Sequence, residues 1–315
     1  MLYGILGGIF WAIETVVLGI AMGTSPFLNG AQAIVLAPFA ATFLHDGASA
    51  LFAFLYNLIR GELKPMLRSV RTPAFRYVIL ASVIGGPVGM TGYVLTVNNM
   101  GSAIGAVASA VYPAVGTLLA WIFLKERVQW YRWLFLGAAL LGVFGLGYAP
   151  GGGVENFWLG ILGVAMCAIG WGVEAVILAK AFSVCDIKDE YALAFRQTTS
   201  ALTFGALILP VIGGWEFTAS LFLGGIYPHI PILSIAALAA TASYLFYYRA
   251  IGTVGASKAM ALNITYTAWA VVFTVILTRD TSILNPLTVL CALAVVVFGI
   301  LSAIDIKELI GKKRN

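Results

Sequence analysis

Apolar runs long enough to cross a bilayer fill almost the whole chain. A helix needs roughly 20 residues to span a hydrocarbon core of about 30 Å. Ten such runs follow one another, at about 2–23, 31–58, 75–97, 102–124, 130–149, 157–181, 191–212, 231–250, 256–278 and 285–305. With 61% hydrophobic and only 10% charged residues, the chain leaves no stretch for a soluble domain. The sequence therefore predicts an all-α integral membrane protein with ten transmembrane helices.

Basic residues are distributed unevenly between the two sides of these predicted spans. If the N-terminus is inside, all of the 18 Lys and Arg residues fall on the cytoplasmic side except Arg279, which falls outside, and Arg196, which lies within a span. The positive-inside rule then places both termini in the cytoplasm. We expect a multi-pass protein of a bacterial inner (cytoplasmic) membrane. The net charge of +5 reflects this topology and does not indicate nucleic-acid binding.

The chain divides into two units of similar organisation. Residues 1–150 and 157–315 each hold five predicted spans, and a turn-rich linker, 151–156, separates them. Because five is an odd number, the second unit must cross the bilayer in the opposite sense, which makes the two units inverted repeats. Proteins of this kind place a substrate site near the bilayer midplane, at the interface of the repeats.

One pair of residue types recurs in the first span of each unit. GIFWAIETVVLG holds Trp11 and Glu14, and AIGWGVEAVILA holds Trp171 and Glu174. Residues three apart share a helix face. A quaternary ammonium has no N–H donor, so proteins recognise it with aromatic faces and a nearby negative charge. We therefore predict that both pairs bind substrate, Glu174 ranking above Glu14. The alternative is that Trp171 only packs and that Glu174 pairs with Arg196.

Further aromatic residues are available to complete an aromatic cage. Two tyrosines share one face of the eighth span, whereas Tyr248 is expected to turn away, and three residues of the ninth span follow one another at three-residue steps. The alternative is packing in the core or at the lipid interface. The remaining predicted members of the substrate site are Tyr112, Tyr244, Tyr247, Asn263, Tyr266 and Trp269.

His45 and Asp46 lie near the middle of the second predicted span. Histidine titrates near neutrality, so this pair is a candidate to carry a coupled proton, and competition between a proton and the substrate at Glu174 is the rival route. Alternatively, Asp46 only accepts a hydrogen bond from His45 or pairs with Arg196. We predict that Arg196 is a structural counter-charge, because a buried guanidinium commonly neutralises an acid.

Several of these segments resemble a known family. Two five-helix halves, each with a small-residue fourth helix that ends in a charged loop such as LKERV, resemble the EamA type of the drug/metabolite transporter superfamily. A narrower resemblance, to the bacterial LicB-type choline importers, is carried by GGIFW, the HD pair at 45–46, GGPVGM, SAVYPA, AIGWGVE, FRQTTS, ASYLFYY and ALNITYTAW. Glu14 departs from that family's pattern. The resemblance implies a ten-helix transporter fold with cage residues in ASYLFYY and ALNITYTAW.

We therefore predict a secondary transporter that imports choline or a related small quaternary-ammonium cation, driven by the membrane potential with or without proton symport. One alternative is an exporter or exchanger of amino acids or drug-like cations. Another is an integral-membrane enzyme acting on lipid head groups, which the mid-membrane depth of the acids disfavours. The sequence has no phosphate-binding P-loop, and we expect no cofactor, metal site or catalytic residue. Besides the cation, the expected partners are lipid and protons. A homodimer is an alternative to a monomer.

Overall fold

The computed structural model describes residues 1–28, 30–100, 102–147, 156–184, 187–223 and 229–305. Regular secondary structure in these ranges is entirely helical. Seven helical segments of the described residues are long and apolar enough to cross a membrane: Leu2–Met22, Val35–Ile59, Pro73–Met100, Phe157–Val184, His229–Val254, Ala256–Thr278 and Pro286–Ala303. The all-α, multi-pass membrane character of the chain is thereby confirmed. Except for Asn156, the predicted linker 151–156 lies outside the described residues.

Every predicted span coincides with helical residues. The first half contains α1 (Leu2–Met22), α2 (Ala31–Ile59), α4 (Pro73–Val83), the π-helix η1 (Ile84–Val88), α5 (Gly89–Met100), α6 (Ser102–Phe123) and α7 (Trp130–Leu146). The second half contains α8 (Phe157–Val184), α9 (Asp189–Thr203), the π-helix η2 (Phe204–Ile208), α10 (Leu209–Val211), α12 (His229–Val254), α13 (Ala256–Asn263), α14 (Tyr266–Thr278) and α15 (Pro286–Ala303). Two short helices, α3 (Leu63–Ser69) and α11 (Trp215–Ser220), are additional to the predicted spans.

The seventh predicted span, 191–212, carries buried polar side chains. It is divided among α9, η2 and α10, and it is not among the seven long apolar segments of the described chain. Polar side chains such as those of Arg196 and Gln197 lower its hydropathy, yet both are buried. Buried polar groups in a membrane helix face protein rather than lipid, whereas Leu202 and Leu207 of the same span are exposed.

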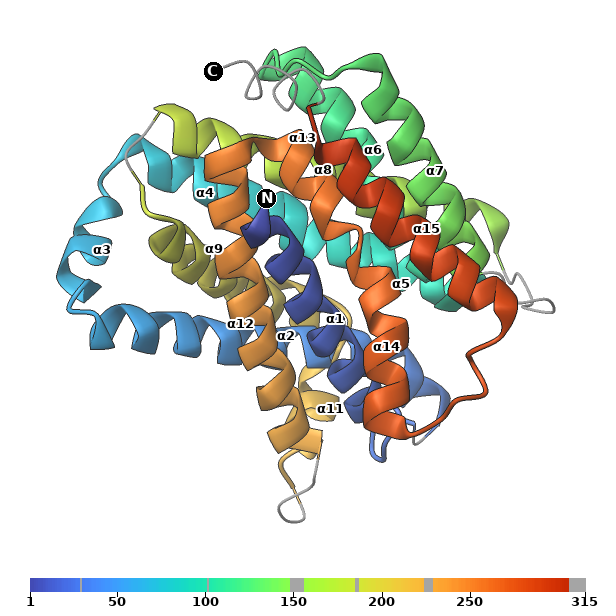
Figure 1. Cartoon of the computed structure of the whole chain (residues 1–315). Coiled ribbons are helices and arrows are strands. Elements are labelled where there is room, and N and C mark those ends of the chain that lie inside the picture. Colours follow the sequence, from blue (N-terminus) through green and yellow to red (C-terminus); the bar gives the residue numbers. More distant parts are fainter. Residues whose placement is uncertain (29, 101, 148–155, 185–186, 224–228, 306–315) are drawn as a thin grey trace.

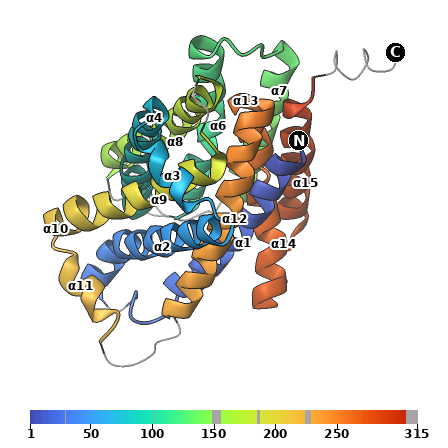
Figure 2. The same ribbon diagram turned by 90° about the vertical axis from the view of Figure 1, so that its left-hand side faces the viewer.

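The first helix of each half packs into the other half. In Figure 1, α1 lies between α12 and α14, and α1 packs most extensively against these two helices, with α13 as a further neighbour. In the same way, α8 packs against α4, α5 and α6. The remaining helices pair across the two halves: α2 contacts α9, as Figure 2 shows, and α7 contacts α15. The two halves therefore share one packed interior.

Glycines on α8 allow this close packing. A Cβ atom added at Gly163 would lie 2.5 Å from the carbonyl oxygen of Gly92 on α5, and one added at Gly172 would lie 2.9 Å from the backbone nitrogen of Gly116 on α6. Such distances leave no room for a side chain, so the backbones approach each other directly, as small residues permit in membrane helices. This approach presses the face of α8 that carries Trp171 and Glu174 against the first half.

The ninth predicted span contains a short turn near its centre, between two helices. The α13 helix ends at Asn263 and α14 begins at Tyr266, with Ile264 and Thr265 between them. Ile264 and Thr265 are both buried and keep right-handed helical backbone angles, φ −55° and ψ −23° at Ile264 and φ −61° and ψ −14° at Thr265. The interruption is therefore a short helical turn, and the stripe through Asn263, Tyr266 and Trp269 stays a prediction.

Candidate functional site

Trp11 lies at the centre of a group of aromatic rings. Its ring centroid is 5.1 Å from that of Tyr266, 6.0 Å from Trp171, 6.1 Å from Tyr244 and 6.3 Å from Tyr112. These five residues come from α14, α8, α12, α6 and α1, and we refer to them as the aromatic cluster. The tertiary fold thus brings together both Trp residues of the repeated Trp and Glu pattern and three of the predicted tyrosines.

Trp171 is held in place from the first half of the chain. Its indole Nε1 donates a hydrogen bond of 2.9 Å to the carbonyl oxygen of Gly85 in η1, and its ring stacks on Tyr93 with a centroid distance of 6.3 Å. A Cβ atom at Gly89 would approach the indole to 2.7 Å. Sequence reasoning did not single out Tyr93. The GGPVGM motif could have indicated that this segment contacts Trp171, because its glycines permit the close approach.

Three further residues predicted for the cage, Asn263, Tyr247 and Trp269, are not part of the aromatic cluster and differ in what they contact. Asn263 Nδ2 donates a hydrogen bond of 2.8 Å to the hydroxyl of Tyr112, which ties the end of α13 to the cluster. Tyr247 is buried and its ring contacts Tyr248. Trp269 is half-buried, and in the described part of the chain no aromatic ring pairs with it.

A charged network lies beside the aromatic cluster. Arg196 Nε is 3.0 Å from Glu174 Oε1, and Arg196 Nη1 is 3.5 Å from Asp46 Oδ2. His45 Nδ1 is 3.0 Å from Asp46 Oδ1, and His45 Nε2 is 3.5 Å from Glu14 Oε1. All five side chains are buried, although they come from four different helices. The two alternatives foreseen for these residues, pairing of Arg196 with an acid and of His45 with Asp46, are both present.

Neighbouring polar residues complete the network. Arg196 Nη1 donates to Gln197 Oε1 at 2.6 Å, and Gln197 Nε2 donates to Ser49 Oγ at 2.8 Å. The Tyr248 hydroxyl donates to Glu174 Oε1 at 3.3 Å. The expectation that Tyr248 turns away was therefore wrong. Tyr244 and Tyr248 are four residues apart and so share a helix face, a signal that the three-residue spacing of Tyr244 and Tyr247 obscured.

Tyr244 connects the charged network to the aromatic cluster. The guanidinium carbon of Arg196 lies 4.7 Å from the centroid of the Tyr244 ring, in cation–π geometry. The same ring contacts Trp11. The two groups of residues are thus adjacent and share one side chain.

The network contains more acidic than basic groups. With all three carboxylates ionised, Glu14, Asp46 and Glu174 face a single guanidinium, which leaves an excess of two negative charges if His45 is neutral and one if it is protonated. Uncompensated buried charge is costly. A cationic ligand or additional protons would reduce that cost, so the arrangement is suited to binding positive charge.

The aromatic rings contact one another directly. Trp11 and Tyr266 are stacked at 5.1 Å with an interplanar angle of 18°. A cation binds over a ring face within about 6 Å of its centroid, so a cation held between these two faces needs the rings to move apart. In this structure the aromatic cluster is therefore closed to a cation between the Trp11 and Tyr266 rings. Binding between these faces would move α1 relative to α14.

Comparison with known proteins relates the chain to transporters. Residues 1–148 match the EamA-like transporter family. Protein LicB of Haemophilus influenzae is 25% identical over 292 residues, which cover 93% of this chain and 93% of that protein. A crystal structure of a protein with 19% sequence identity superposes with a TM-score of 0.70 over 100% of this chain and 98% of that one, so the fold is shared. The resemblance inferred from the sequence motifs is confirmed.

Proposed function

We propose that this EamA-like membrane protein is a secondary transporter that imports choline or a related small quaternary-ammonium cation. The observation that carries the proposal is the aromatic cluster, which adjoins a buried network with more acidic than basic groups. Aromatic faces each contribute about 0.5–2 kcal/mol to the binding of such a cation. Choline is the first candidate because the motifs that build the cluster resemble those of the LicB-type choline importers.

The packing of the helices supports an inverted-repeat transporter with ten spans. The first helix of residues 1–150, α1, packs against α12 and α14, and the first helix of residues 157–315, α8, packs against the corresponding helices α4, α5 and α6. Such a reciprocal arrangement is expected if a pseudo-two-fold axis relates the two units. In this proposal both termini lie in the cytoplasm of a bacterial cell, as the distribution of Lys and Arg indicates.

Substrate binding is tested with two variants and a matched control. The assay measures choline binding to the purified protein by its thermal stabilisation, since a ligand of the folded state raises the unfolding temperature. Trp171→Ala and Glu174→Gln should each lower the affinity for choline at least tenfold. More choline is then needed to reach the same rise in the unfolding temperature. Trp158→Ala, which removes a 78% exposed ring from the same helix, should leave it unchanged. Choline affinity unaltered in both site variants would exclude the proposed site.

Betaine and amino acids complete this assay as comparison ligands. Betaine carries the same quaternary ammonium together with a carboxylate, which the negative charge of the network disfavours. We expect choline to stabilise the protein and betaine to have little effect. Stabilisation by neutral amino acids instead would favour the amino-acid exporters of the superfamily.

The energy source has two candidates. The membrane potential alone favours entry of a monovalent cation by about 2.3 kcal/mol per 100 mV. Proton symport would add to this, and His45, Asp46 and Glu174 are its candidate carriers because they lie in the charged network. Proteoliposomes with an acidic exterior and no membrane potential separate the two. Faster choline uptake under these conditions supports symport, and unchanged uptake supports uniport.

An exporter or exchanger is the second candidate function. The observation that favours it is Glu14, a third carboxylate that lies 3.5 Å from His45 and so extends the network into α1. An extra acid suits a dication or exchange against more than one proton. The charge moved per substrate distinguishes the candidates: uniport of choline moves one positive charge inward, whereas an exchanger moves a different net charge.

A further inference from the structure

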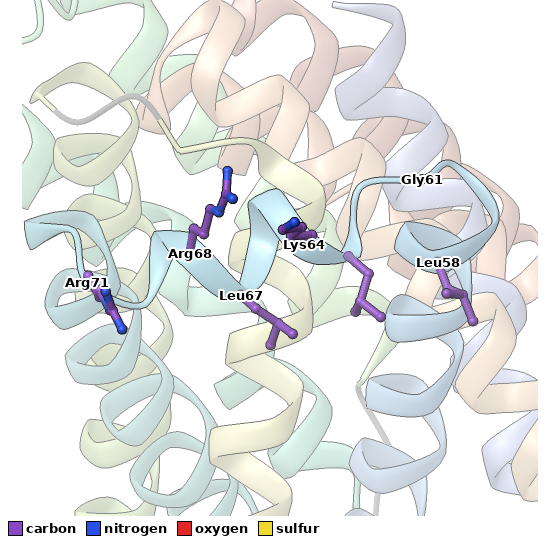
Figure 3. A pocket seen from close by; sticks show the side chains of 7 residues that line it. Leu58, Gly61, Lys64, Leu67, Arg68 and Arg71 are labelled. Carbon is purple, nitrogen blue, oxygen red and sulfur yellow. The ribbon is translucent and has the colours of Figure 1, made fainter.

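A pocket lies on the outer surface of α3, apart from the aromatic cluster and the charged network. Figure 3 shows this pocket, which is formed by the end of α2 and by α3, and Figure 1 shows that α3 lies at the edge of the molecule between α2 and α4. Its volume of about 630 Å³ is sufficient for a small polar group with adjoining apolar atoms. The pocket is lined by Leu58, Gly61, Leu63, Lys64, Leu67, Arg68 and Arg71.

The charged side chains of the pocket are all basic. Lys64, Arg68 and Arg71 are exposed, and in the described part of the chain none of them forms an ion pair with an acidic side chain. Glu62 is the nearest acid in the sequence, but its carboxylate accepts hydrogen bonds from Lys188 at 2.8 Å and from Tyr191. The pocket therefore presents three uncompensated positive charges, which attract an anion.

The position of α3 places these charges at the membrane surface. The segment connects the end of one long apolar helix, Val35–Ile59, with the start of the next, Pro73–Met100. Met66 is fully buried and anchors α3 to the protein core. A short connection between two membrane helices, held against the protein in this way, lies at the boundary of the hydrocarbon region.

Apolar side chains are exposed next to the basic ones. Leu58, Ile59 and Leu67 are 53%, 85% and 54% exposed. In Figure 3 the side chains of Leu58, Leu67 and Arg71 extend to one side of the segment, whereas Arg68 extends to the other. Exposed leucines and basic residues side by side match the boundary between acyl chains and head groups. A site for a free anion in water would not require exposed leucines beside the basic residues.

We propose that this pocket binds an anionic phospholipid, with Lys64, Arg68 and Arg71 holding the phosphate-bearing head group and Leu58 and Leu67 contacting the first part of the acyl chains. Basic residues that flank a membrane helix attract the anionic lipids of the cytoplasmic leaflet, and the distribution of basic residues assigns α3 to that side. The site is independent of the proposed cation transport.

Titration of the purified full-length protein with phosphatidylglycerol tests the proposal. Native mass spectrometry measures the fraction of protein that carries bound lipid, with zwitterionic phosphatidylethanolamine titrated in parallel. The variant Lys64→Gln/Arg68→Gln/Arg71→Gln should lose at least tenfold in affinity for phosphatidylglycerol, and the single variant Arg68→Gln about fivefold. The control Lys125→Gln/Arg127→Gln/Lys180→Gln removes the same charge from exposed residues elsewhere and should retain wild-type affinity.

The outcomes distinguish a lipid site from other sources of binding. An equal loss in the pocket variant and the control would overturn the proposal, because binding would then depend only on net charge. Displacement of the lipid by millimolar inorganic phosphate would overturn it in favour of a free-anion site. If the triple variant does not fold, the single variant Arg68→Gln decides, and an unchanged affinity for phosphatidylglycerol in that variant also overturns the proposal.

Discussion

Arg196 is joined to Glu174 within the protein interior, with 3.0 Å between Arg196 Nε and Glu174 Oε1 and both side chains buried. Removal of one partner from a buried ion pair leaves an uncompensated charge and costs about 3–5 kcal/mol. We predict that Arg196→Gln decreases the free energy of unfolding by about this amount. The measurement is the midpoint of thermal unfolding in detergent, which should fall. Choline binding should be weakened as well, since Glu174 and Asp46 lose their orientation.

A double variant provides the control for this prediction. Arg196→Gln/Glu174→Gln removes both charges of the pair, so it should be more stable than Arg196→Gln alone. The coupling free energy of the double-mutant cycle reports on the direct interaction. If the effects of the two substitutions simply add, the pair contributes nothing, and the prediction fails.

Gly85 is packed directly against Glu174. A Cβ atom at Gly85 would lie 1.8 Å from Glu174 Oε2 and 2.7 Å from Glu174 Cβ. We predict that Gly85→Ala displaces the carboxylate from Arg196, because overpacking of a dense interior costs about 1–3 kcal/mol, and that it reduces choline binding severalfold. The measurement is choline affinity together with the unfolding midpoint.

Gly137 provides the matched substitution for Gly85. It lies inside α7, and a Cβ atom there would meet no atom within 4 Å. Gly137→Ala should be neutral or stabilise the protein by about 0.5–1 kcal/mol, since alanine favours a helix over glycine. Equal effects of Gly85→Ala and Gly137→Ala would show that the close approach to Glu174 is unimportant.

Glu126 of the LKERV loop caps the start of α13 in the other half of the chain. Its carboxylate accepts hydrogen bonds from the backbone nitrogens of Ala256 at 2.8 Å and Ser257 at 3.1 Å. Loss of such a cap costs about 0.5–2 kcal/mol. We predict that Glu126→Ala destabilises the protein by this amount and accelerates hydrogen exchange at the amides of Ala256 and Ser257. Glu216→Ala, a substitution on the short α11, should leave exchange at these amides unchanged.

Glu62 links the connection after α2 to the start of α9 and gives stability a dependence on pH. Hydrogen bonds from Lys188 and Tyr191 hold the pKa of Glu62 below its ordinary value. The unfolded state therefore binds the proton more readily, so the interaction stabilises the folded protein above the ordinary glutamate pKa of about 4.3. That contribution is lost as the pH falls through the folded-state pKa.

The measurement for Glu62 is the unfolding midpoint as a function of pH. We predict that Glu62→Gln lowers the midpoint at pH 7, whereas wild type and variant converge in acid, below the folded-state pKa. Glu216→Gln, on an exposed residue of the short α11, provides a comparison for a general charge effect. A difference between wild type and Glu62→Gln that persists unchanged into acid would contradict the assignment.

Much of the candidate site follows from local patterns in the sequence. The three-residue spacing of Trp11 and Glu14, and of Trp171 and Glu174, places each pair on one helix face, and Trp11 and Trp171 do meet in the structure. The separation of His45 and Asp46 from Arg196 is large in sequence, so the contact between Asp46 and Arg196 was foreseen only as one of several alternatives. Periodicity describes a face but does not say which helix that face meets.

The errors arise where tertiary packing overrides the spacing along one helix. Trp269 was grouped with Tyr266 by its three-residue spacing, yet Tyr266 stacks on Trp11 whereas in the described part of the chain no aromatic ring pairs with Trp269. Tyr248 was set aside, yet its hydroxyl reaches Glu174 because α12 and α8 approach each other. Tyr93 entered no prediction, although it stacks on Trp171.

By itself, the sequence determined the all-helical membrane character, the location of the helices and the residue types available for binding a cation, because hydrophobic run length and charge depend only on local composition. Only the tertiary structure decided that Glu14, His45, Asp46, Arg196 and Glu174 form one charged network and that Tyr244 joins it to Trp11. The physical reason is that these contacts depend on how closely distant helices approach. Glycines such as Gly85 determine that distance once the helices have packed together.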